Sequence, residues 1–176
     1  MVYPAQHHRV SEYFLQRLNG REIVFEFFIV FSRFEYALMR SGFINGDHRG
    51  VYANWDRFAA TEKDNFNPDQ TPELQEAVTY FQNRPPRKQI VEEEDLVWIN
   101  TPRPDNEPLL LTLTVLIRRV RNNLFHGNKI SDLLERYSPR NRDLLRYSIV
   151  ILYSFLDLNS HVRNVFLGEL RQELKL

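Results

Sequence analysis

The segment Arg21–Ser41 reads REIVFEFFIVFSRFEYALMRS, and its apolar side chains recur at spacings of three and four. That spacing predicts an α-helix. One apolar face consists of Ile23, Phe27, Val30, Phe34 and Ala37. A second stripe beside it consists of Val24, Phe28, Phe31 and Leu38. A helix that is apolar around much of its circumference must be covered on more than one side, so we predict a central helix or an interface helix.

Helical patterns also dominate the rest of the chain. Thr71 and Ser138 are expected N-caps, because each precedes a proline and proline is favoured at the first helical position. Further helices are expected at residues 53–66, 72–84, 108–126, 139–160 and 162–174. We therefore predict an all-α fold, in which a single domain over residues 1–176 forms an up-and-down bundle of about five or six helices.

The connection over residues 84–108 differs in composition from these helices. It holds many of the chain's 9 prolines and the acidic run EEED. Such a composition predicts an extended, irregular connection, which we interpret as a flap. The apolar piece Leu96–Ile99 inside it either forms a strand-like edge or plugs a groove, and its pattern does not separate the two. Earlier in the chain, Gly42 and the loop INGDHRG (44–50) are expected to end the first helix in turns.

Charge and composition exclude several classes of protein. With 23 Lys and Arg against 23 Asp and Glu, the formal net charge is zero, so any contact with RNA has to be local. The absence of cysteine excludes disulfides, thiolate metal sites and cysteine nucleophiles. The chain begins without a signal-like apolar run, and no apolar segment approaches the roughly 20 residues that a bilayer span needs. We expect a cytoplasmic protein that does not bind a membrane.

The segment Arg118–Lys129, RRVRNNLFHGNK, gathers arginines, asparagines and a histidine at the end of a predicted helix. A histidine beside fixed cations can transfer a proton near neutral pH, and arginines can stabilise the charge that develops on a phosphate. Because the ribose 2′-OH of RNA supplies the nucleophile, these groups suffice for RNA cleavage without a metal ion. We expect no metal and no cofactor, since the sequence has neither a glycine-rich phosphate loop nor histidines paired at metal-ligand spacing.

Arg121-Asn122, three further residues and then His126 resemble the signature of the HEPN superfamily, an arginine followed after about four to six residues by a histidine. The segment Arg33–Phe43, RFEYALMRSGF, is similar to the acidic first long helix of many HEPN proteins. Over residues 22–160 the resemblance lies in the order of the predicted helices. It implies a HEPN-like fold and a metal-independent endoribonuclease, in which the two chains of a homodimer bring their motifs together at one cleft.

The resemblance also implies a role for each residue of the motif. His126 acts as the general acid or base, and Arg121 binds the scissile phosphate and stabilises its extra negative charge. Asn122 orients the ribose or His126. RNA is then the substrate. Members of the superfamily act as toxins, in abortive infection and in RNA-guided phage defence, so a cognate antitoxin or another protein of a defence complex is an expected partner.

Three further cations and one carboxylate are candidate supporting residues. The cations are Arg118, Arg119 and Lys129. They form an expected RNA-binding patch, or else they are ordinary solvated charges on a helix. Glu35 lies on an apolar stripe, where a carboxylate needs a positive partner, and we hypothesise that it fixes the guanidinium of Arg121. The alternative partners of Glu35 are Arg146 and Arg163.

Arg121 and His126 do not share a face of a straight helix. Five residues at about 100° each place them about 140° apart. Either the last turn unwinds toward Gly127 or the second chain of a dimer completes the pair, and we favour both together. A solvated helix end, where basic residues meet the helix dipole, is the alternative interpretation of the motif. The alternative functions are a non-catalytic HEPN-like RNA-binding module and a helical interaction subunit of a defence complex.

Overall fold

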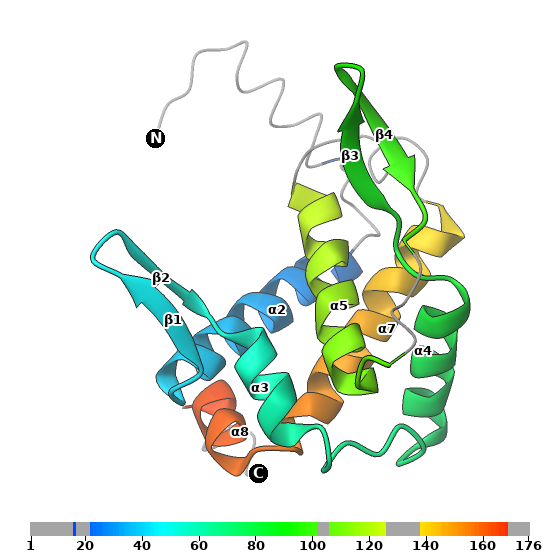
Figure 1. The fold of residues 1–176 in the computed structure, drawn as a ribbon. Coiled ribbons are helices and arrows are strands. Elements are labelled where there is room, and N and C mark those ends of the chain that lie inside the picture. The colour runs from blue at the N-terminus through cyan, green and yellow to red at the C-terminus, as the bar shows by residue number, and fades with distance from the viewer. Residues whose placement is uncertain (1–15, 17–21, 102–105, 126–137, 169–176) are drawn as a thin grey trace.

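The computed structural model of the protein describes residues 16, 22–101, 106–125 and 138–168. Within these ranges the chain forms six helices and two short antiparallel hairpins (Figure 1). The helices are α2 (Glu22–Arg40), α3 (Trp55–Glu62), α4 (Pro72–Asn83), α5 (Leu109–Phe125), α7 (Pro139–Leu156) and α8 (Ser160–Leu167). The hairpins join β1 (Ile44–Asp47) to β2 (Gly50–Ala53) and β3 (Lys88–Glu92) to β4 (Asp95–Ile99). None of these helices is both long and apolar enough to cross a membrane.

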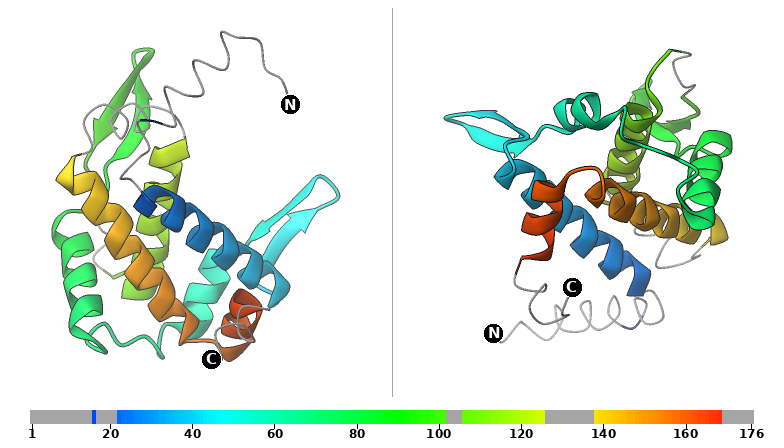
Figure 2. Two further views of the ribbon diagram at one scale, coloured as in Figure 1. Left: turned by 180° about the vertical axis from the view of Figure 1, so that it is seen from behind. Right: turned by 90° about the horizontal axis from the view of Figure 1, so that it is seen from below.

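α2 is buried along most of its first apolar stripe but along only part of its second, since Phe28 is 45% exposed. It packs against α7 and α8, and the β1–β2 hairpin follows directly at its end (Figure 2). Its buried side chains are Phe27, Val30, Phe31, Phe34, Ala37 and Leu38. Arg33 fastens α2 to α8, because its Nε donates to the carbonyl oxygen of Phe166 at 2.6 Å and its guanidinium lies 5.7 Å from the centroid of the Phe166 ring.

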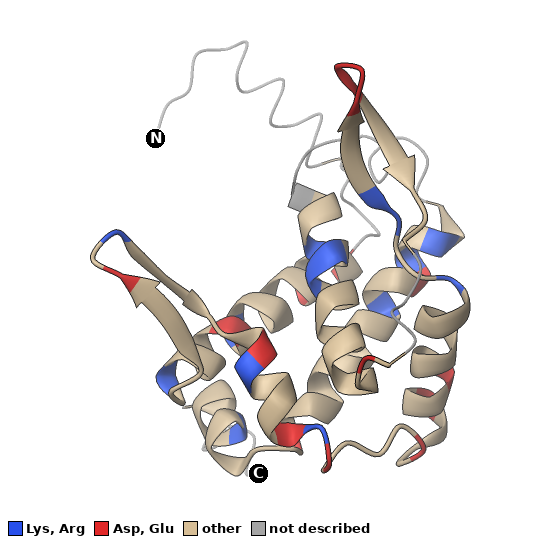
Figure 3. Cartoon of the chain, viewed as in Figure 1, with Lys and Arg blue, Asp and Glu red and all other residues tan. Residues whose placement is uncertain are grey.

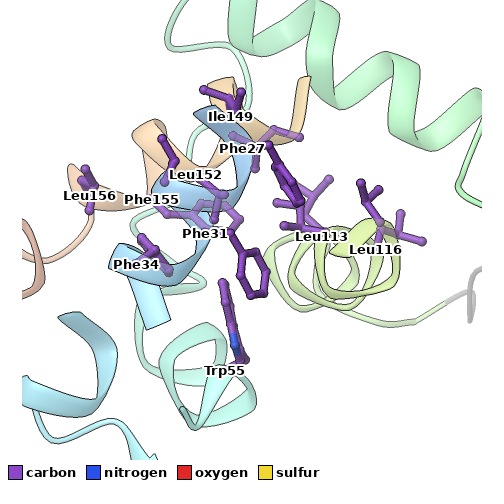
Figure 4. Packing of buried hydrophobic residues seen from close by; sticks show 14 of the residues in the cluster. Phe27, Phe31, Phe34, Trp55, Leu113, Leu116, Ile149, Leu152, Phe155 and Leu156 are labelled. Atoms are coloured by element: carbon purple, nitrogen blue, oxygen red, sulfur yellow. The ribbon is translucent and has the colours of Figure 1, made fainter. Parts of the chain in front are cut away.

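Aromatic rings fill the space between α2, α3 and α7 (Figure 4). Phe34 has no exposed surface, and the centroid of its ring lies 5.1 Å from Trp55, 5.7 Å from Phe58 and 6.1 Å from Phe155. Aromatic pairs at such separations stabilise a core beyond the apolar area that they bury. One cluster of buried side chains extends from these rings through all six described helices.

The helix starts confirm the capping predictions. The hydroxyl of Thr71 accepts a hydrogen bond from the backbone N–H three residues later at 3.2 Å, and Pro72 is the first residue of α4. The hydroxyl of Ser138 accepts the equivalent bond at 3.3 Å, and Pro139 begins α7. Each cap satisfies a backbone donor that the first turn of a helix leaves without a partner. These capping hydrogen bonds determine the residues at which α4 and α7 begin.

The predicted all-α class is wrong in one respect, because the chain also contains strands. The loop INGDHRG forms β1 and the turn into β2, where a carboxylate oxygen of Asp47 accepts the backbone N–H of Arg49 at 2.8 Å. The expected irregular flap contains a regular antiparallel hairpin over residues 88–99. Of the two alternatives for Leu96–Ile99, the strand-like one is therefore confirmed.

The turn of the β3–β4 hairpin explains why the sequence did not predict it. Glu92 pairs with Asp95, so Glu93 and Glu94 form a two-residue turn, with φ values of 48° and 70°. Turns of this kind need positive φ at both positions and usually carry Asn-Gly or a similar pair. Two glutamates give no such signal, and four consecutive carboxylates suggest a solvated loop instead.

Candidate functional site

The C-terminal half of α5 carries the polar residues of the candidate site. One side of this helix is buried against the core, through Leu113, Leu116, Ile117, Val120 and Leu124. The apolar periodicity thereby leaves Arg118, Arg119, Arg121, Asn122 and Asn123 outside the core, partly or fully exposed. The helix fixes their positions, because its buried face leaves little freedom to rotate about the axis.

Arg121 is held by an aromatic ring and by its neighbour. Its guanidinium carbon lies 5.6 Å from the centroid of the Phe31 ring, a separation at which a cation and an aromatic face attract each other. Its Nη1 donates to Oδ1 of Asn122 at 3.0 Å. Phe31 is buried and stacks on Trp55 of α3 with a centroid distance of 5.5 Å (Figure 4). The guanidinium therefore rests on a rigid stack that belongs to the core.

Glu35 contacts the same stack through Trp55. Nε1 of Trp55 donates to Oε1 of Glu35 at 3.0 Å. The ion pairs recorded among the described residues do not include one between Glu35 and Arg121, and the hypothesised contact between the two stays a prediction. Trp55 stacks on Phe31 and Phe34 of α2, and its indole N–H reaches the carboxylate of Glu35 on the same helix. A supporting role for Glu35 remains a prediction, and it would act through the indole.

The alternative partners of Glu35 are engaged elsewhere. Arg146 lies 3.5 Å from a carboxylate oxygen of Glu76, and Arg163 lies 3.4 Å from one of Asp157. Both pairs are largely exposed, so they contribute little to stability.

Arg118 and Arg119 point toward different neighbours of α5. Nη2 of Arg118 lies 2.7 Å from Oδ1 of Asp56, a largely exposed side chain in the first turn of α3. Nη1 of Arg119 donates to the carbonyl oxygen of Pro86 at 3.1 Å, where the chain approaches β3. Burial lowers the pKa of the Arg119 guanidinium, which nevertheless stays protonated at any physiological pH. Arg119 is thus a cation that has lost part of its hydration.

A groove of about 710 Å³ lies between this face of α5 and the β3–β4 hairpin. The hairpin lines it with Lys88, Gln89, Ile90, Val91 and Leu96. The helix lines it with Val115, Arg118, Arg119, Asn122 and Asn123. Figure 3 shows basic residues on α5 and at the start of β3, and acidic residues at the tip of the hairpin. Sequence reasoning missed the hairpin residues of the groove, because it took their segment for an irregular flap.

His126 and Lys129 lie outside the described residues, as does Gly127. Their positions relative to Arg121 are therefore not part of the observed geometry, and the expected unwinding of the last turn stays a prediction. The structure brings together Arg121 and Asn122, and it joins Arg118, Arg119 and Asn122 in one groove. Within the described ranges, no three His, Asp or Glu side chains are gathered as metal ligands would be.

Arg121, its aromatic support and the groove thus occupy one end of α5, and together they form the candidate site. No model of a known protein family, no curated protein and no solved structure matches the chain.

Proposed function

We propose that the protein is a metal-independent endoribonuclease of the HEPN type, in which two copies of the chain bring Arg121 and His126 to one cleft. The observation that carries the proposal is the placement of Arg121. Its guanidinium is fixed over Phe31 and bonded to Asn122, five residues before the histidine of the motif. An arginine held in advance at this place costs no reorganisation when charge develops on a phosphate.

The proposed chemistry uses the substrate's own nucleophile. One His126 accepts the proton of the ribose 2′-OH while its oxygen attacks the adjacent phosphorus. The bond from phosphorus to the 5′ oxygen breaks, and the departing oxygen takes a proton from the His126 of the other copy. The products are a 2′,3′-cyclic phosphate and a 5′-hydroxyl. Arg121 stabilises the extra negative charge on the phosphate oxygens during transfer, and Asn122 orients the ribose or the imidazole.

An exposed apolar stripe on α2 supports the association of two copies. Phe25, Ile29 and Tyr36 are 49%, 59% and 52% exposed. Their spacing of four and seven residues puts them on one face of the helix. A stripe of large apolar side chains on a helix surface is typical of an interaction site. The same helix supports Arg121 through Phe31, which faces the core, so α2 would contribute both to the proposed interface and to the support of the candidate site.

Self-association through this stripe gives a specific prediction. Replacing Ile29 with aspartate puts a charge at the centre of the proposed interface, so we expect the mass measured by light scattering to fall from two chains to one. RNA cleavage should fall with it. The control is Val51→Asp, which places the same charge on an equally exposed apolar side chain of β2. A wild-type protein that cleaves RNA as a single chain would contradict the shared cleft.

A binding role without catalysis is the second candidate. The observation that favours it is the β1–β2 hairpin, where Ile44, Val51 and Tyr52 are all exposed. These side chains suit a protein partner, such as a cognate antitoxin or a defence-complex subunit in the cytoplasm.

Incubation of the purified protein with total RNA in excess chelator tests the enzymatic proposal. We expect the wild-type protein to cleave RNA and His126→Ala to lose at least about a hundredfold in rate, since general acid–base catalysis contributes that much. The control is His161→Ala, an exposed histidine of α8. Absence of cleavage by the wild-type protein on any RNA, or equal cleavage by His126→Ala, would overturn the proposal. Cleavage that depends on metal would show a different chemistry.

A further inference from the structure

We propose that the groove between α5 and the β3–β4 hairpin binds a nucleotide of single-stranded RNA, and that the hairpin is one wall of the substrate path. This inference rests on the proposed function, because it places the groove next to the scissile phosphate. Asn122 connects the two, since it lines the groove and also bonds to Arg121. A strand whose phosphate lies at Arg121 therefore has its neighbouring nucleotide within reach of the groove.

The charges of the groove favour a phosphate. Lys88, Arg118 and Arg119 all line it, and its described lining contains no carboxylate. Arg119 is the strongest indication, because burial has removed part of its hydration and only the carbonyl oxygen of Pro86 is described as its acceptor. A phosphate oxygen would supply the negative charge that such a guanidinium lacks.

The hairpin offers apolar surface to a base. Val91 and Leu96 lie directly opposite each other in the register of β3 and β4, and they are 69% and 60% exposed. Val115 faces the same groove from α5. Paired apolar side chains that line a groove instead of the core indicate a ligand with an apolar face. An unstacked base has such a face on each side, whereas the bases of a duplex are already stacked on one another.

Amide groups complete the lining and suit the edges of a base. Gln89, Asn122 and Asn123 reach the groove, and the Nε2 atom of Gln89 is buried without a hydrogen-bond partner among the described atoms. A buried donor of this kind costs free energy unless a ligand or water accepts from it. Single-stranded RNA is usually read through such contacts to base edges.

The acidic tip of the hairpin determines which end of the groove the phosphates of the RNA approach. Residues 92–95 are all exposed carboxylates, and the nearest lysine, Lys88, lies at the other end of β3 (Figure 3). Phosphates are repelled from the tip and attracted to the base of the hairpin. The groove volume of about 710 Å³ lies within the range of about 300–1,000 Å³ that small-molecule sites occupy. We therefore expect it to hold one nucleotide unit, with the chain of phosphates running along α5.

Binding of an uncleavable oligonucleotide tests the inference apart from catalysis. The probe is a short, fluorescently labelled, 2′-O-methylated single strand, and its fluorescence anisotropy gives Kd at several salt concentrations. Lys88→Glu removes a phosphate contact, so we expect about tenfold weaker binding and a shallower salt dependence. The double variant Val91→Ser with Leu96→Ser loses the contact with the base, so we expect binding about five- to tenfold weaker with the salt dependence unchanged.

The control is Lys63→Glu, which reverses an exposed charge at the end of α3, away from the groove lining. All substituted side chains are exposed, and thermal melting checks that each variant is folded. Wild-type Kd values for both groove variants, tighter binding of the matching duplex, or no binding of the single strand would overturn the inference. If the groove variants bind more weakly but the wild-type protein cleaves no RNA, the groove is still a binding site for single-stranded RNA and the nuclease proposal is refuted. If the wild-type protein cleaves RNA but both groove variants bind the oligonucleotide as tightly as the wild type, the nuclease proposal stands and the groove proposal is refuted.

Discussion

Replacing Arg121 with alanine is expected to lower the rate of RNA cleavage by about two to three orders of magnitude, the usual loss when one pre-placed stabiliser of transition-state charge is removed. The side chain lies over Phe31 and bonds to Asn122, so its removal leaves both neighbours in place. Single-turnover cleavage of a labelled RNA under excess enzyme measures the effect. Most of the loss should fall in kcat, because the charge that Arg121 meets develops during the reaction.

Two further variants separate geometry from charge. Arg121→Lys keeps the positive charge but loses the planar group that lies over Phe31, so it should restore only part of the rate. Arg142→Ala is the matched control. This arginine of α7 is largely exposed, and its recorded ion pair is a long contact of 3.8 Å with the adjacent residue Asp143. Cleavage by Arg121→Ala at the control's rate would exclude Arg121 from the reaction. A change in KM alone would make it a binding residue.

The largest effect on stability is expected at Phe34. Replacing it with alanine should lower the free energy of unfolding by about 3–5 kcal/mol, the range for a fully buried phenylalanine. The ring has no exposed surface and contacts Trp55, Phe58 and Phe155, so its loss leaves a cavity between α2, α3 and α7. Urea unfolding followed by circular dichroism measures the change. A large part of the stability of a domain this size would be lost.

Tyr52→Ala is the control for that substitution, because it removes an aromatic ring that is mostly exposed on β2. We expect it to cost less than about 1 kcal/mol, as surface substitutions usually do. If both variants unfold at the same urea concentration, the aromatic cluster does not hold the three helices together. An unchanged m-value would show that the two variants expose the same surface on unfolding.

Most of the helical fold was predictable, because its signals are local. The periodicity of residues 21–41 predicted α2 to within one residue at each end, and the Thr-Pro and Ser-Pro pairs marked where α4 and α7 begin. The hairpins were not predictable in the same way. Their strands are only four or five residues long, and the Glu93-Glu94 turn lacks the residues that normally mark positive φ.

The candidate site was predictable only where its residues are neighbours in the sequence. The cluster around Arg121 and Asn122 stands out along α5, and the structure keeps these two side chains in contact. The support of Arg121 depends on residues that lie far away in the sequence, in α2 and α3. Glu35 accepts a hydrogen bond from the indole of Trp55, and Arg121 lies over the ring of Phe31, and the sequence indicated neither of these aromatic contacts. Lys88 was missed because its strand was not recognised.

The two left-handed glutamates of the β3–β4 turn have a consequence for local dynamics. Each non-glycine residue in this conformation costs on the order of 1 kcal/mol, and neighbouring carboxylates add repulsion. The hairpin meets the helices mainly where β3 touches α5, so little burial offsets that cost. Its amides should therefore exchange with solvent far sooner than those of α2, through openings that leave the core intact. The β3–β4 side of the groove would then open and close many times between successive global unfolding events.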